Sequence, residues 1–517
     1  MNLIDTFERN VTQIPGEPAF IFGDRRWTYR EADDLACRIA NGLIHWGVTR
    51  ETKCASISRN SDLSFITLLG ILKARGSWVP LNAGNAEEEL LYMVDHFDVE
   101  VLFYSSEFEP FARKVRKQIP GVRKFVCYDA DGELGPDLRT WASGQPNERR
   151  LLPWDPDAIA MLRGTGGTTG RPKAVMNTNR NFVTMLGCYQ ARMHFEGRPR
   201  YLAAAPLTHG ACMNAFINMA MGGCMVILPK FDAVAVMAAI QQHRINVVGL
   251  PPTAIYSMLS HPRVREFDYS SLRYFLYGAA PMSSAKLAEA IGVFGKVMTQ
   301  AYGQHEAPAS ATFLSPQEHF DASGNIDEKR LLSCGRPAAL TRVALMAEDG
   351  RLITQPGEVG EIVLQGDIVF RGYYKNPEAT ADVSRFGWHH TGDAGYQDEQ
   401  GYFYICDRVK EMIISGGFNI YPLEVEQVIL AHPAVNDCAV VGVPDEKWGE
   451  AVKAVIELKP GMTAVAEELI AECRAKLGGI KTPKSIDFVD ELPRSAVGKV
   501  VRRTVREKYW AGQARNV

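Results

Sequence analysis

The chain has 517 residues, more than one ordinary hydrophobic core holds together, and this length predicts two or more domains. Its hydrophobic content of 46% and charged content of 23% are typical of a soluble globular protein. The net charge of −3 argues against a general affinity for nucleic acid, so a polyanionic ligand must meet local positive charge.

The cysteines and the first residues indicate a cellular compartment. The 10 cysteines are dispersed and none belongs to a Cys-x-x-Cys pair, so neither a zinc site nor a disulfide framework is predicted. Free thiols fit a reducing cytosol, and we expect a cytoplasmic protein. Residues 1–9 contain acidic side chains and no apolar run, which argues against a signal peptide.

The first clear element is a helix that begins after Thr28. Thr28 and Glu31 have the spacing of a capping box, and Gly47 is typical of a helix end. Apolar residues between them recur at helical spacing and predict one buried face: Leu35, Ile39, Leu43 and Trp46. Two short apolar runs, 99–104 and 125–128, then predict strands.

A glycine-rich loop follows the next predicted strand, residues 158–162. Residues 163–173 contain four glycines, three threonines and a lysine. Glycine lets the backbone approach a ligand closely, and successive N–H groups form an anion-binding concavity to which Lys173 adds charge. The loop is not a Walker A motif, because Pro172 precedes the lysine and no hydroxyl residue follows it. A phosphate cradle is predicted, and a plain surface loop is the alternative.

Residues 201–229 contain no Asp, Glu, Lys or Arg, and their length would cross a bilayer. However, polar and helix-breaking residues such as Pro206, His209 and Asn214 are costly or disruptive in lipid. We therefore expect a loop, a buried helix and a buried strand over 224–228. A membrane span is the less favoured alternative.

The second half of the chain changes pattern twice. Alternating strand and helix patterns predict a layered α/β region: strands 245–250 and 274–277, helices 233–243 and 283–291. Short strands with glycine-rich turns then predict a compact β subdomain: 342–346, 361–364 and 402–405. After 407–410 the chain restarts as a small α+β unit. The expected fold is a large α/β domain, residues 1–407, with helix-flanked sheets and the β subdomain, and a small C-terminal domain, residues 408–517.

Eight motifs occur in one order along the chain: 165–173, 277–281, 300–306, 357–361, 391–393, 407–410, 415–422 and 493–499. Each is weak alone, but in this order they make the chain resemble the acyl-adenylate-forming superfamily. That superfamily includes acyl-CoA synthetases, luciferases and peptide-synthetase adenylation domains, and the resemblance runs from Thr28 to Arg503. It implies ATP-dependent activation of a carboxylic acid to acyl-AMP, followed by thioester formation with coenzyme A.

The chemistry explains the residue types of the first motif. A carboxylate must attack the α-phosphate of ATP, so both partners are anions, and positioning and charge neutralisation carry the step. The resemblance assigns the β- and γ-phosphates to Thr165, Gly166, Gly167, Thr168, Thr169, Gly170 and Lys173. It assigns Mg²⁺, a hard ion suited to oxygen ligands, to Glu306 with help from Thr168.

The resemblance also assigns the nucleoside. Tyr302 would lie against adenine, and the remaining positions of the pocket are Gly278, Ala279, Ala280, Pro281, Gly303, Gln304 and His305. Asp393 would accept hydrogen bonds from both ribose hydroxyls with help from Arg408. His305 stands where the family usually has threonine, and a histidine donor is expected to substitute for that hydroxyl. Taken singly, Glu306 reads as a surface acid, Tyr302 as a core aromatic and Asp393 as a turn former.

The C-terminal motifs imply a lid that rotates between two half-reactions. Lys499 would bridge the substrate carboxylate and the α-phosphate; a solvated cationic tail or a nucleic-acid contact is the alternative. Lys410 occupies the hinge position. Gly416 and Gly417 would line the pantetheine tunnel, and a plain turn explains them equally well.

The acyl group and its acceptor are the least determined. The resemblance places five residues around the acyl pocket: His209, Gly210, Ala211, Gly278 and Ala307. His209 would border both this pocket and the thiol tunnel. Residues 210–214 offer no aspartate to pair with a substrate amine, so a simple fatty or aryl acid is expected.

Three alternatives to an acyl-CoA synthetase stay open. The first is a stand-alone adenylation enzyme that loads a carrier-protein phosphopantetheine. The second is a silent acyl- or nucleotide-binding protein, and the third, more remote, is a luciferase-like oxidation. The sequence leaves the oligomeric state open.

Overall fold

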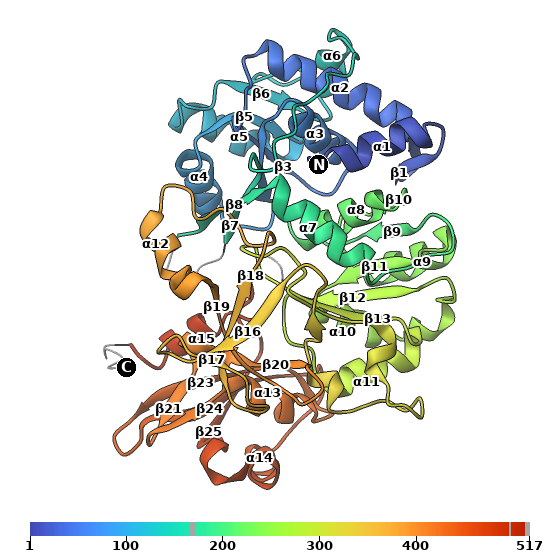
Figure 1. The fold of residues 1–517 in the computed structure, drawn as a ribbon. Helices are drawn as coiled ribbons and strands as arrows, with labels where there is room; N and C mark the ends of the chain where they lie inside the picture. The colour runs from blue at the N-terminus through green and yellow to red at the C-terminus, as the bar shows by residue number, and fades with distance from the viewer. Residues whose placement is uncertain (166–170, 496–497, 512–517) are drawn as a thin grey trace.

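The structure is a computed structural model that describes residues 1–165, 171–495 and 498–511. Within these residues, four sheets and their helices form a large N-terminal unit and a smaller C-terminal unit (Figure 1). This is the expected fold class: a layered α/β region, a β subdomain and a small α+β unit.

The first sheet has the strand order β6-β5-β3-β4-β7-β8. Its strands are β3 (Lys53–Ser58), β4 (Ser77–Asn82), β5 (Val99–Tyr104), β6 (Lys124–Cys127), β7 (Ile159–Thr165) and β8 (Lys173–Thr178). Its pairs are parallel except for the β7–β8 hairpin. The first half of the chain also supplies α1 (Asp5–Gln13), α2 (Tyr29–His45), α3 (Asp62–Lys73), α4 (Glu87–His96), η1 (Ser106–Phe108), α5 (Glu109–Gln118) and α6 (Leu138–Ser143). The predicted capping box of α2 is confirmed, with both reciprocal hydrogen bonds present between Thr28 and Glu31.

The second sheet has nine strands in the order β15-β14-β13-β12-β11-β9-β10-β1-β2. Its strands are β1 (Pro18–Phe22), β2 (Arg25–Thr28), β9 (Arg200–Ala203), β10 (Cys224–Ile227), β11 (Val247–Leu250), β12 (Tyr274–Gly278), β13 (Met298–Tyr302), β14 (Thr312–Leu314) and β15 (Arg336–Pro337). Its helices are α7 (Asn179–Gln190), α8 (Gly210–Ala220), α9 (Ala233–His243), α10 (Pro252–Leu259), α11 (Ser284–Phe294) and the short turns η2 (Val264–Glu266), η3 (Pro316–His319) and η4 (Arg330–Leu332).

The predicted buried helix and strand of residues 201–229 are α8 and β10. The expected loop at the start of this segment begins instead with strand β9, because its apolar residues 201–203 are fully buried between β10 and β11. Among the described residues, none of the helices combines the length and apolar character that crossing a bilayer requires. The charge-free stretch is therefore the interior of a layered domain.

The two sheets stack through shared helices. The largest apolar cluster joins α2, α3, α7 and α8 to residues of both sheets, including Trp78, Phe103 and Tyr201. A second cluster packs α9, α10 and α11 on the other face of the nine-stranded sheet, and a third packs α4 and α5 on the other face of the first sheet. Because both faces of each sheet are covered, the parallel strands read as continuous apolar runs.

The predicted β subdomain is an antiparallel sheet of order β17-β16-β18-β19-β20. It consists of β16 (Arg342–Met346), β17 (Leu352–Ile353), β18 (Gly360–Gln365), β19 (His389–Gln397) and β20 (Phe403–Arg408), with α12 (Pro377–Asp382) and η5 (Arg385–Gly387) between β18 and β19. After β20 a single 3-10 turn, η6 (Val409–Glu411), leads into the last sheet.

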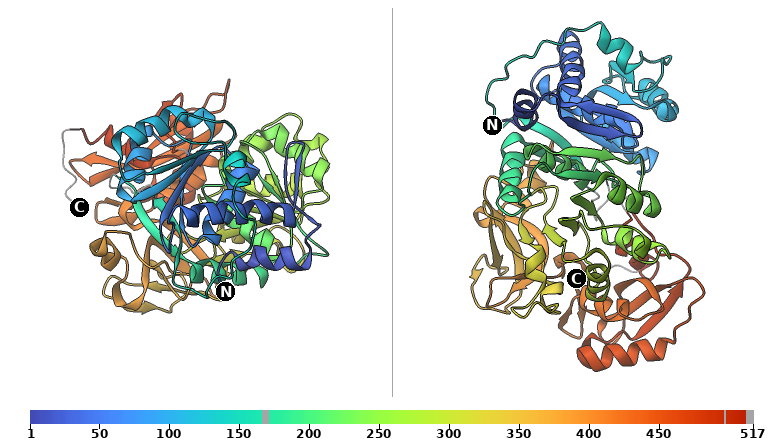
Figure 2. Two further views of the ribbon diagram at one scale, coloured as in Figure 1. Left: turned by 90° about the horizontal axis from the view of Figure 1, so that it is seen from above. Right: turned by 90° about the vertical axis from the view of Figure 1, so that its right-hand side faces the viewer.

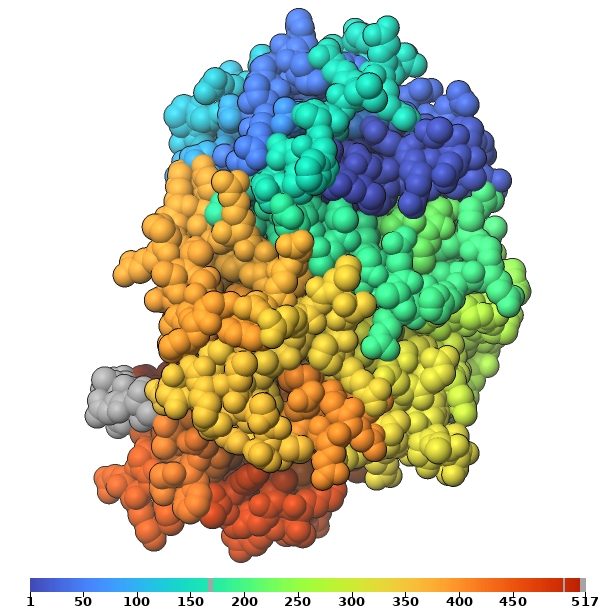
Figure 3. All heavy atoms as spheres, in the orientation of Figure 1, coloured from blue at the N-terminus to red at the C-terminus, as the bar shows by residue number. Residues whose placement is uncertain are grey.

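The C-terminal unit has a sheet of order β22-β21-β24-β23 with β25 beside β24. Its elements are β21 (Ile413–Ser415), β22 (Phe418–Ile420), α13 (Pro422–Leu430), β23 (Val435–Asp445), β24 (Gly449–Leu458), α14 (Ala466–Lys481), β25 (Ser485–Val489) and α15 (Arg502–Glu507). It has an apolar core of its own. In Figure 1 and in the right-hand view of Figure 2 it lies at the end of the molecule opposite the first sheet, and Figure 3 shows it packed below the β subdomain.

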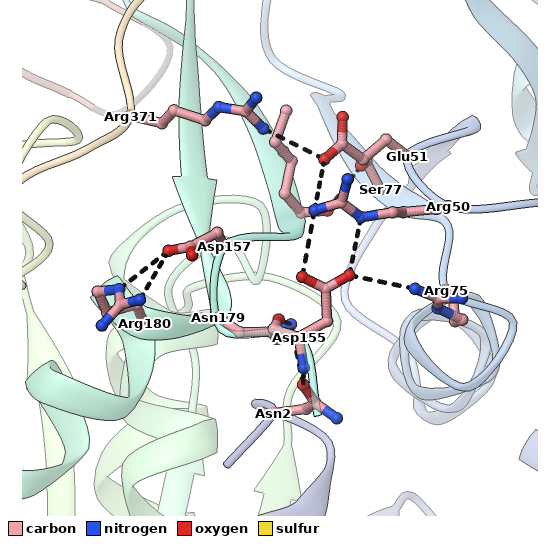
Figure 4. A network of polar contacts seen from close by, with 11 residues as sticks. Asn2, Arg50, Glu51, Arg75, Ser77, Asp155, Asp157, Asn179, Arg180 and Arg371 are labelled. Atoms are coloured by element: carbon pink, nitrogen blue, oxygen red, sulfur yellow. Dashed lines mark hydrogen bonds and ion pairs between the residues drawn. The ribbon is translucent and has the colours of Figure 1, made fainter. Parts of the chain in front are cut away.

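A polar network ties the linker before β7 to the rest of the N-terminal unit (Figure 4). Asp155 accepts from Arg50 at 2.7 Å and from Arg75 at 3.1 Å, and its backbone N–H donates to Asn2. Arg371, from the segment after β18, contacts Glu51 at 3.3 Å. These contacts hold the segment before β7 against two segments that are distant in the sequence.

Buried histidines should make the fold sensitive to acid. Burial lowers the pKa of His319 and of His389 to about 4, and at His389 the neighbouring His390 contributes. Both are buried; His319 contacts Tyr277 and Ser315, while His389 packs on Phe370. Since the unfolded chain protonates near pH 6.5 and the folded chain near pH 4, stability is complete above pH 6.5 and is lost between these values.

We expect each of these histidines to lower the free energy of unfolding by about 2 kcal/mol at pH 5, relative to its value above pH 6.5. Urea unfolding at pH 7.5 and pH 5.0 measures the loss. His389→Phe keeps an aromatic ring against Phe370 and removes one titrating group, so its loss should be smaller than that of the unmodified chain. An identical loss in both proteins would contradict the assignment to His389.

Candidate active site

The glycine-rich loop lies at the tip of the β7–β8 hairpin. Thr165 and Lys173 are the last paired residues of the two strands, so the hairpin delivers both to the base of the loop. The predicted phosphate-binding residues Gly166, Gly167, Thr168, Thr169 and Gly170 lie outside the described residues. The structure therefore describes the two strands that flank the loop.

Lys173 shares an aromatic neighbour with Glu306. The ammonium of Lys173 lies 5.0 Å from the centroid of the Tyr373 ring. The hydroxyl of Tyr373 donates to Glu306 Oε1 at 2.7 Å. The cation at the loop and the carboxylate predicted to bind Mg²⁺ are thus brought together through one tyrosine. The carboxylate of Glu306 offers two oxygens. Such oxygens suit a hard cation such as Mg²⁺, which keeps most of its other ligands as water and phosphate.

Tyr373 is positioned by pairing along β8. The backbone N–H of Arg371 donates to Met176 O at 3.0 Å, and that of Tyr374 donates to Ala174 O at 2.8 Å. Residue 373 therefore lies opposite Val175 as if in a further strand. The pairing places the Tyr373 side chain near the end of β8 that carries Lys173.

The segment that carries Glu306 is a tight turn after β13. The N–H of Gln304 donates to Ala307 O at 2.9 Å, and Ala309 has a positive φ of 50°. A Cβ at Gly303 would lie 2.7 Å from Ala307 O, so only glycine fits. The turn aims Glu306 away from Tyr302, although they are four residues apart, and lets each join a different polar group.

Asp393 is the centre of the second polar group. It accepts from the Tyr302 hydroxyl at 2.5 Å and from Gln304 Nε2 at 2.9 Å. Arg408 Nε contacts its other oxygen at 2.8 Å. Asp393 is only 5% exposed, and this burial raises its pKa, while Arg408 and Tyr302 oppose the rise. Because a carboxylate offers about four acceptor positions, a place remains for a further donor.

The predicted adenine-pocket turn follows β12. A Cβ at Gly278 would lie 2.6 Å from Ala301 O, which explains the glycine. Ala279 has a φ of 63°, a left-handed conformation that costs free energy for any residue with a Cβ. Gln427 of α13, in the C-terminal unit, donates to Met282 O just after Ala280 and Pro281. Both units therefore meet at this turn.

Two histidines lie at the other side of the Glu306 turn. The rings of His209 and His305 are 5.9 Å apart. Burial, and then the charge of Arg163, lower the pKa of His209 to about 4. The same two causes and His209 hold the pKa of His305 well below its ordinary value. Both rings are thus neutral at physiological pH.

Of the predicted acyl-pocket residues, Gly210 and Ala211 begin helix α8, directly after His209 at its N-cap. Ala211 and Ala307 are buried. Since the His305 ring lies beside His209, the start of α8 and the Glu306 turn face each other. The small side chains predicted for the pocket are therefore on adjoining elements.

Lys499 lies in a hairpin that reaches the N-terminal unit. The Ser495 N–H donates to Lys499 O, and the Gly498 N–H donates to Ser495 O, both at 2.8 Å. A Cβ at Gly498 would lie 3.2 Å from Thr253 of α10, across the boundary between the two units. The Lys499 side chain reaches solvent, but partial burial and the charge of Arg408 lower its pKa.

Lys410 lies in η6 between the two units, and Arg502 joins the segments around it. Arg502 contacts Asp407 and Glu411 at 2.7 Å each, and it also pairs with Glu426 of α13. One partly buried guanidinium thus connects the last strand of the N-terminal unit, η6 and the C-terminal unit.

Gly416 and Gly417 form the β21–β22 turn with φ values of 58° and 82°. A Cβ at Gly416 would lie 2.5 Å from the Trp448 ring. The turn therefore needs glycine for local reasons. Its contacts lie within the C-terminal unit, and the predicted role in a thiol tunnel stays a prediction.

Several residues that shape the site were not predicted from the sequence. Tyr373 connects Lys173 to Glu306, while Arg163 and Asn177 hold the backbone of His305. Arg163 carries a usable signal, because an arginine in an otherwise apolar strand is costly unless its charge has a purpose. Tyr373 and Asn177 carry no such signal.

Comparisons with known proteins show the family and the fold of this chain. The family described as AMP-binding enzyme matches residues 7–374, and its C-terminal domain matches residues 424–499. The medium/long-chain-fatty-acid–CoA ligase FadD8 of Mycobacterium tuberculosis is 40% identical over 77% of this chain and 68% of that protein. A feruloyl-CoA synthase of an Amycolatopsis species is 36% identical over 97% of this chain and 98% of that protein. The solved structure of the amide bond synthetase McbA from Marinactinospora thermotolerans superposes with a TM-score of 0.89 at 28% identity, covering 98% of this chain and 100% of that one.

Proposed function

The chain belongs to the AMP-binding enzyme family and is an adenylate-forming ligase, and from this premise we propose that it converts a fatty or aryl acid to its coenzyme A thioester. The acid attacks the α-phosphate of ATP, which gives acyl-AMP and pyrophosphate. The coenzyme A thiol then displaces AMP. Both steps join or separate anions, so local positive charge is the main requirement.

One observation carries the proposal. Lys499 follows Gly498, where a Cβ would lie 3.2 Å from Thr253 of the N-terminal unit, so the lysine lies at the boundary between the two units, where its charge and that of Asp393 act on each other. Lys499 is more than a hundred residues from Asp393 in the sequence. A positive charge near Asp393 is what an α-phosphate and a substrate carboxylate would need if they met there. A surface cationic tail would have no reason to be held at this position.

We propose for these residues the roles that the family resemblance implies. Asp393 accepts from the ribose hydroxyls and Tyr302 lies against adenine. Lys173 and the loop hold the β- and γ-phosphates. Glu306, with Thr168, would hold Mg²⁺, which neutralises phosphate charge when bound. Lys499 brings the substrate carboxylate to the α-phosphate.

The acid and the thiol are the open parts of the proposal. Support for fatty and aryl acids comes from the two relatives named above, one a fatty-acid ligase and the other a feruloyl-CoA synthase. The small side chains of Gly210, Ala211 and Ala307 leave room for either chain. Neutral His209 and His305 at the edge of this region fit an uncharged acyl group better than a second carboxylate.

The test is release of AMP from ATP with a panel of fatty and aryl acids. We expect AMP release that requires both an acid and coenzyme A, together with the matching thioester. Release only with a phosphopantetheinyl carrier protein would replace coenzyme A as the acceptor. Light emission with oxygen would indicate the luciferase-like alternative, and no AMP with any acid would leave a silent binding protein.

Asp393→Asn should weaken AMP binding by about 10- to 100-fold, the loss expected for a hydrogen bond to a charged group. The substitution also leaves the cation of Arg408 without its partner at 2.8 Å. Isothermal titration with AMP measures the change. Asp157→Asn, at an exposed pair with Arg180, is the matched control and should bind AMP normally. Unchanged AMP binding in Asp393→Asn would contradict the ribose role.

A further inference from the structure

Arg163 is a buried cation that forms no ion pair with any carboxylate in the part of the chain that the structure describes. Its side chain lies on β7 and is 3% exposed, and burial lowers its pKa to about 10. Among the described residues, no carboxylate oxygen lies within ion-pair distance of its guanidinium. Burying an uncompensated charge costs several kcal/mol, so a chain that keeps one needs it for something other than stability.

The guanidinium of Arg163 is hydrogen-bonded to the backbone of His305, the residue before Glu306. One Arg163 nitrogen donates to His305 O at 2.9 Å, and its Nε donates to Asn177 Oδ1 at 2.8 Å. Asn177 Nδ2 donates to the same His305 carbonyl, also at 2.9 Å. The β7–β8 hairpin, whose tip is the glycine-rich loop, is therefore clamped to the turn that carries Glu306. Strands β7 and β8 and the turn that carries Glu306 are therefore joined while these bonds exist.

The neighbours of Arg163 do not neutralise it. The Phe182 ring lies 5.7 Å from the guanidinium, and an aromatic ring carries no net charge. The charge of Glu306 acts on Arg163 from beyond hydrogen-bond distance. In this low-dielectric surrounding the positive potential extends further than it would in water. Arg163 comes directly before residues 164 and 165, at which strand β7 ends and the glycine-rich loop begins.

We infer that Arg163 is a positioning residue for the triphosphate of ATP, whose negative charge supplies the ion-pair partner that Arg163 does not have among the described residues. It acts in two ways: it clamps the Glu306 turn to the hairpin, and it adds positive potential at the base of the loop. The inference rests on the proposed function. It adds a group that acts on the phosphates from inside the domain, distinct from Lys173 and Lys499.

A purely structural role predicts something different. If Arg163 only stabilised the fold, its loss would weaken every ligand of the nucleotide site in proportion to the fraction of unfolded protein. If Arg163 acts on the phosphates, its loss should instead weaken the binding of ligands that carry phosphates and leave the binding of adenosine nearly unchanged. Adenosine meets the Tyr302 and Asp393 cluster, whereas Mg·ATP also meets the loop and the Glu306 turn.

The experiment compares Mg·ATP and adenosine binding by isothermal titration on the full chain. We expect Arg163→Met to weaken Mg·ATP binding by about 10- to 100-fold and adenosine binding by less than about twofold. Arg163→Lys keeps the charge and should recover at least part of the loss. The control is Arg180→Met, which removes an arginine from an exposed pair with Asp157.

A second variant allows the test even if Arg163→Met does not fold. Asn177→Asp keeps Arg163 and places a carboxylate where Oδ1 now lies, 2.8 Å from its Nε. The new ion pair neutralises the charge, so Mg·ATP should again bind more weakly and adenosine normally. Equal losses for both ligands, or unchanged Mg·ATP binding in both Arg163→Met and Asn177→Asp, would overturn the inference. Failure of all acids to release AMP would refute the proposed function, while these binding ratios would still decide the role of Arg163.

Discussion

Lys499→Ala is expected to slow acyl-adenylate formation by about 10²- to 10³-fold, the usual loss when one charge-stabilising group is removed. The hairpin that carries Lys499 is held by backbone hydrogen bonds to Ser495, and Gly498 meets Thr253 of the N-terminal unit. The backbone of Lys499 is therefore held at the boundary between the two units. Without it, an anionic carboxylate and an anionic phosphate must approach each other with less compensation.

The same substitution should largely spare the second half-reaction, because the lid is expected to turn Lys499 away before the thiol attacks. ATP–pyrophosphate exchange measures the first step, and thioester formation from synthetic acyl-AMP and coenzyme A measures the second. Lys476→Ala, on α14 and paired only with Glu472 among the ion pairs of the described residues, is the control. Equal losses in the two half-reactions would refute the bridging role.

Lys410→Pro is expected to preserve pyrophosphate release and to block thioester formation. Residues 409–411 form one 3-10 turn, whose φ is close to the value that a proline ring imposes, so the observed arrangement of the units is compatible with proline. A rotation about this turn would need a different φ at residue 410. The proline ring does not allow that change.

Two controls separate the backbone from the side chain. Lys410→Ala removes the ammonium and leaves φ free, so both half-reactions should continue. Thermal unfolding of both variants checks the restriction that proline places on Val409, the residue before it. Normal thioester rates in Lys410→Pro would reject the hinge assignment, and a block in Lys410→Ala would assign the effect to the side chain.

Arg502 gives this hinge a physical basis. Its guanidinium joins Asp407, Glu411 and Glu426, which belong to the last N-terminal strand, the 3-10 turn and the C-terminal unit. A partly buried cation shared by three carboxylates keeps all three contacts only if these carboxylates stay near one another. The contacts therefore favour a rotation axis that passes close to Arg502, so that the lid can turn without breaking them.

The sequence by itself determined the features that depend on neighbouring residues. The capping box at Thr28 and Glu31, the strand before the glycine-rich loop and the short strands of the β subdomain were all predicted and are present. Each follows from a local rule: a side chain that satisfies an end of a helix, an apolar run of strand length, or a turn at glycine. Such rules act over a few residues and need no knowledge of the rest of the chain.

Only the tertiary structure decided which distant groups meet. Tyr302 donates to Asp393, 91 residues later, and Tyr373 brings Lys173 to Glu306 because its segment pairs along β8. The lack of a counter-ion at Arg163 also became visible only after packing, since two carboxylates, Glu51 and Asp155, lie near the hairpin but bind other arginines. Long-range partners depend on how sheets stack and in which register strands pair, and no local pattern encodes either.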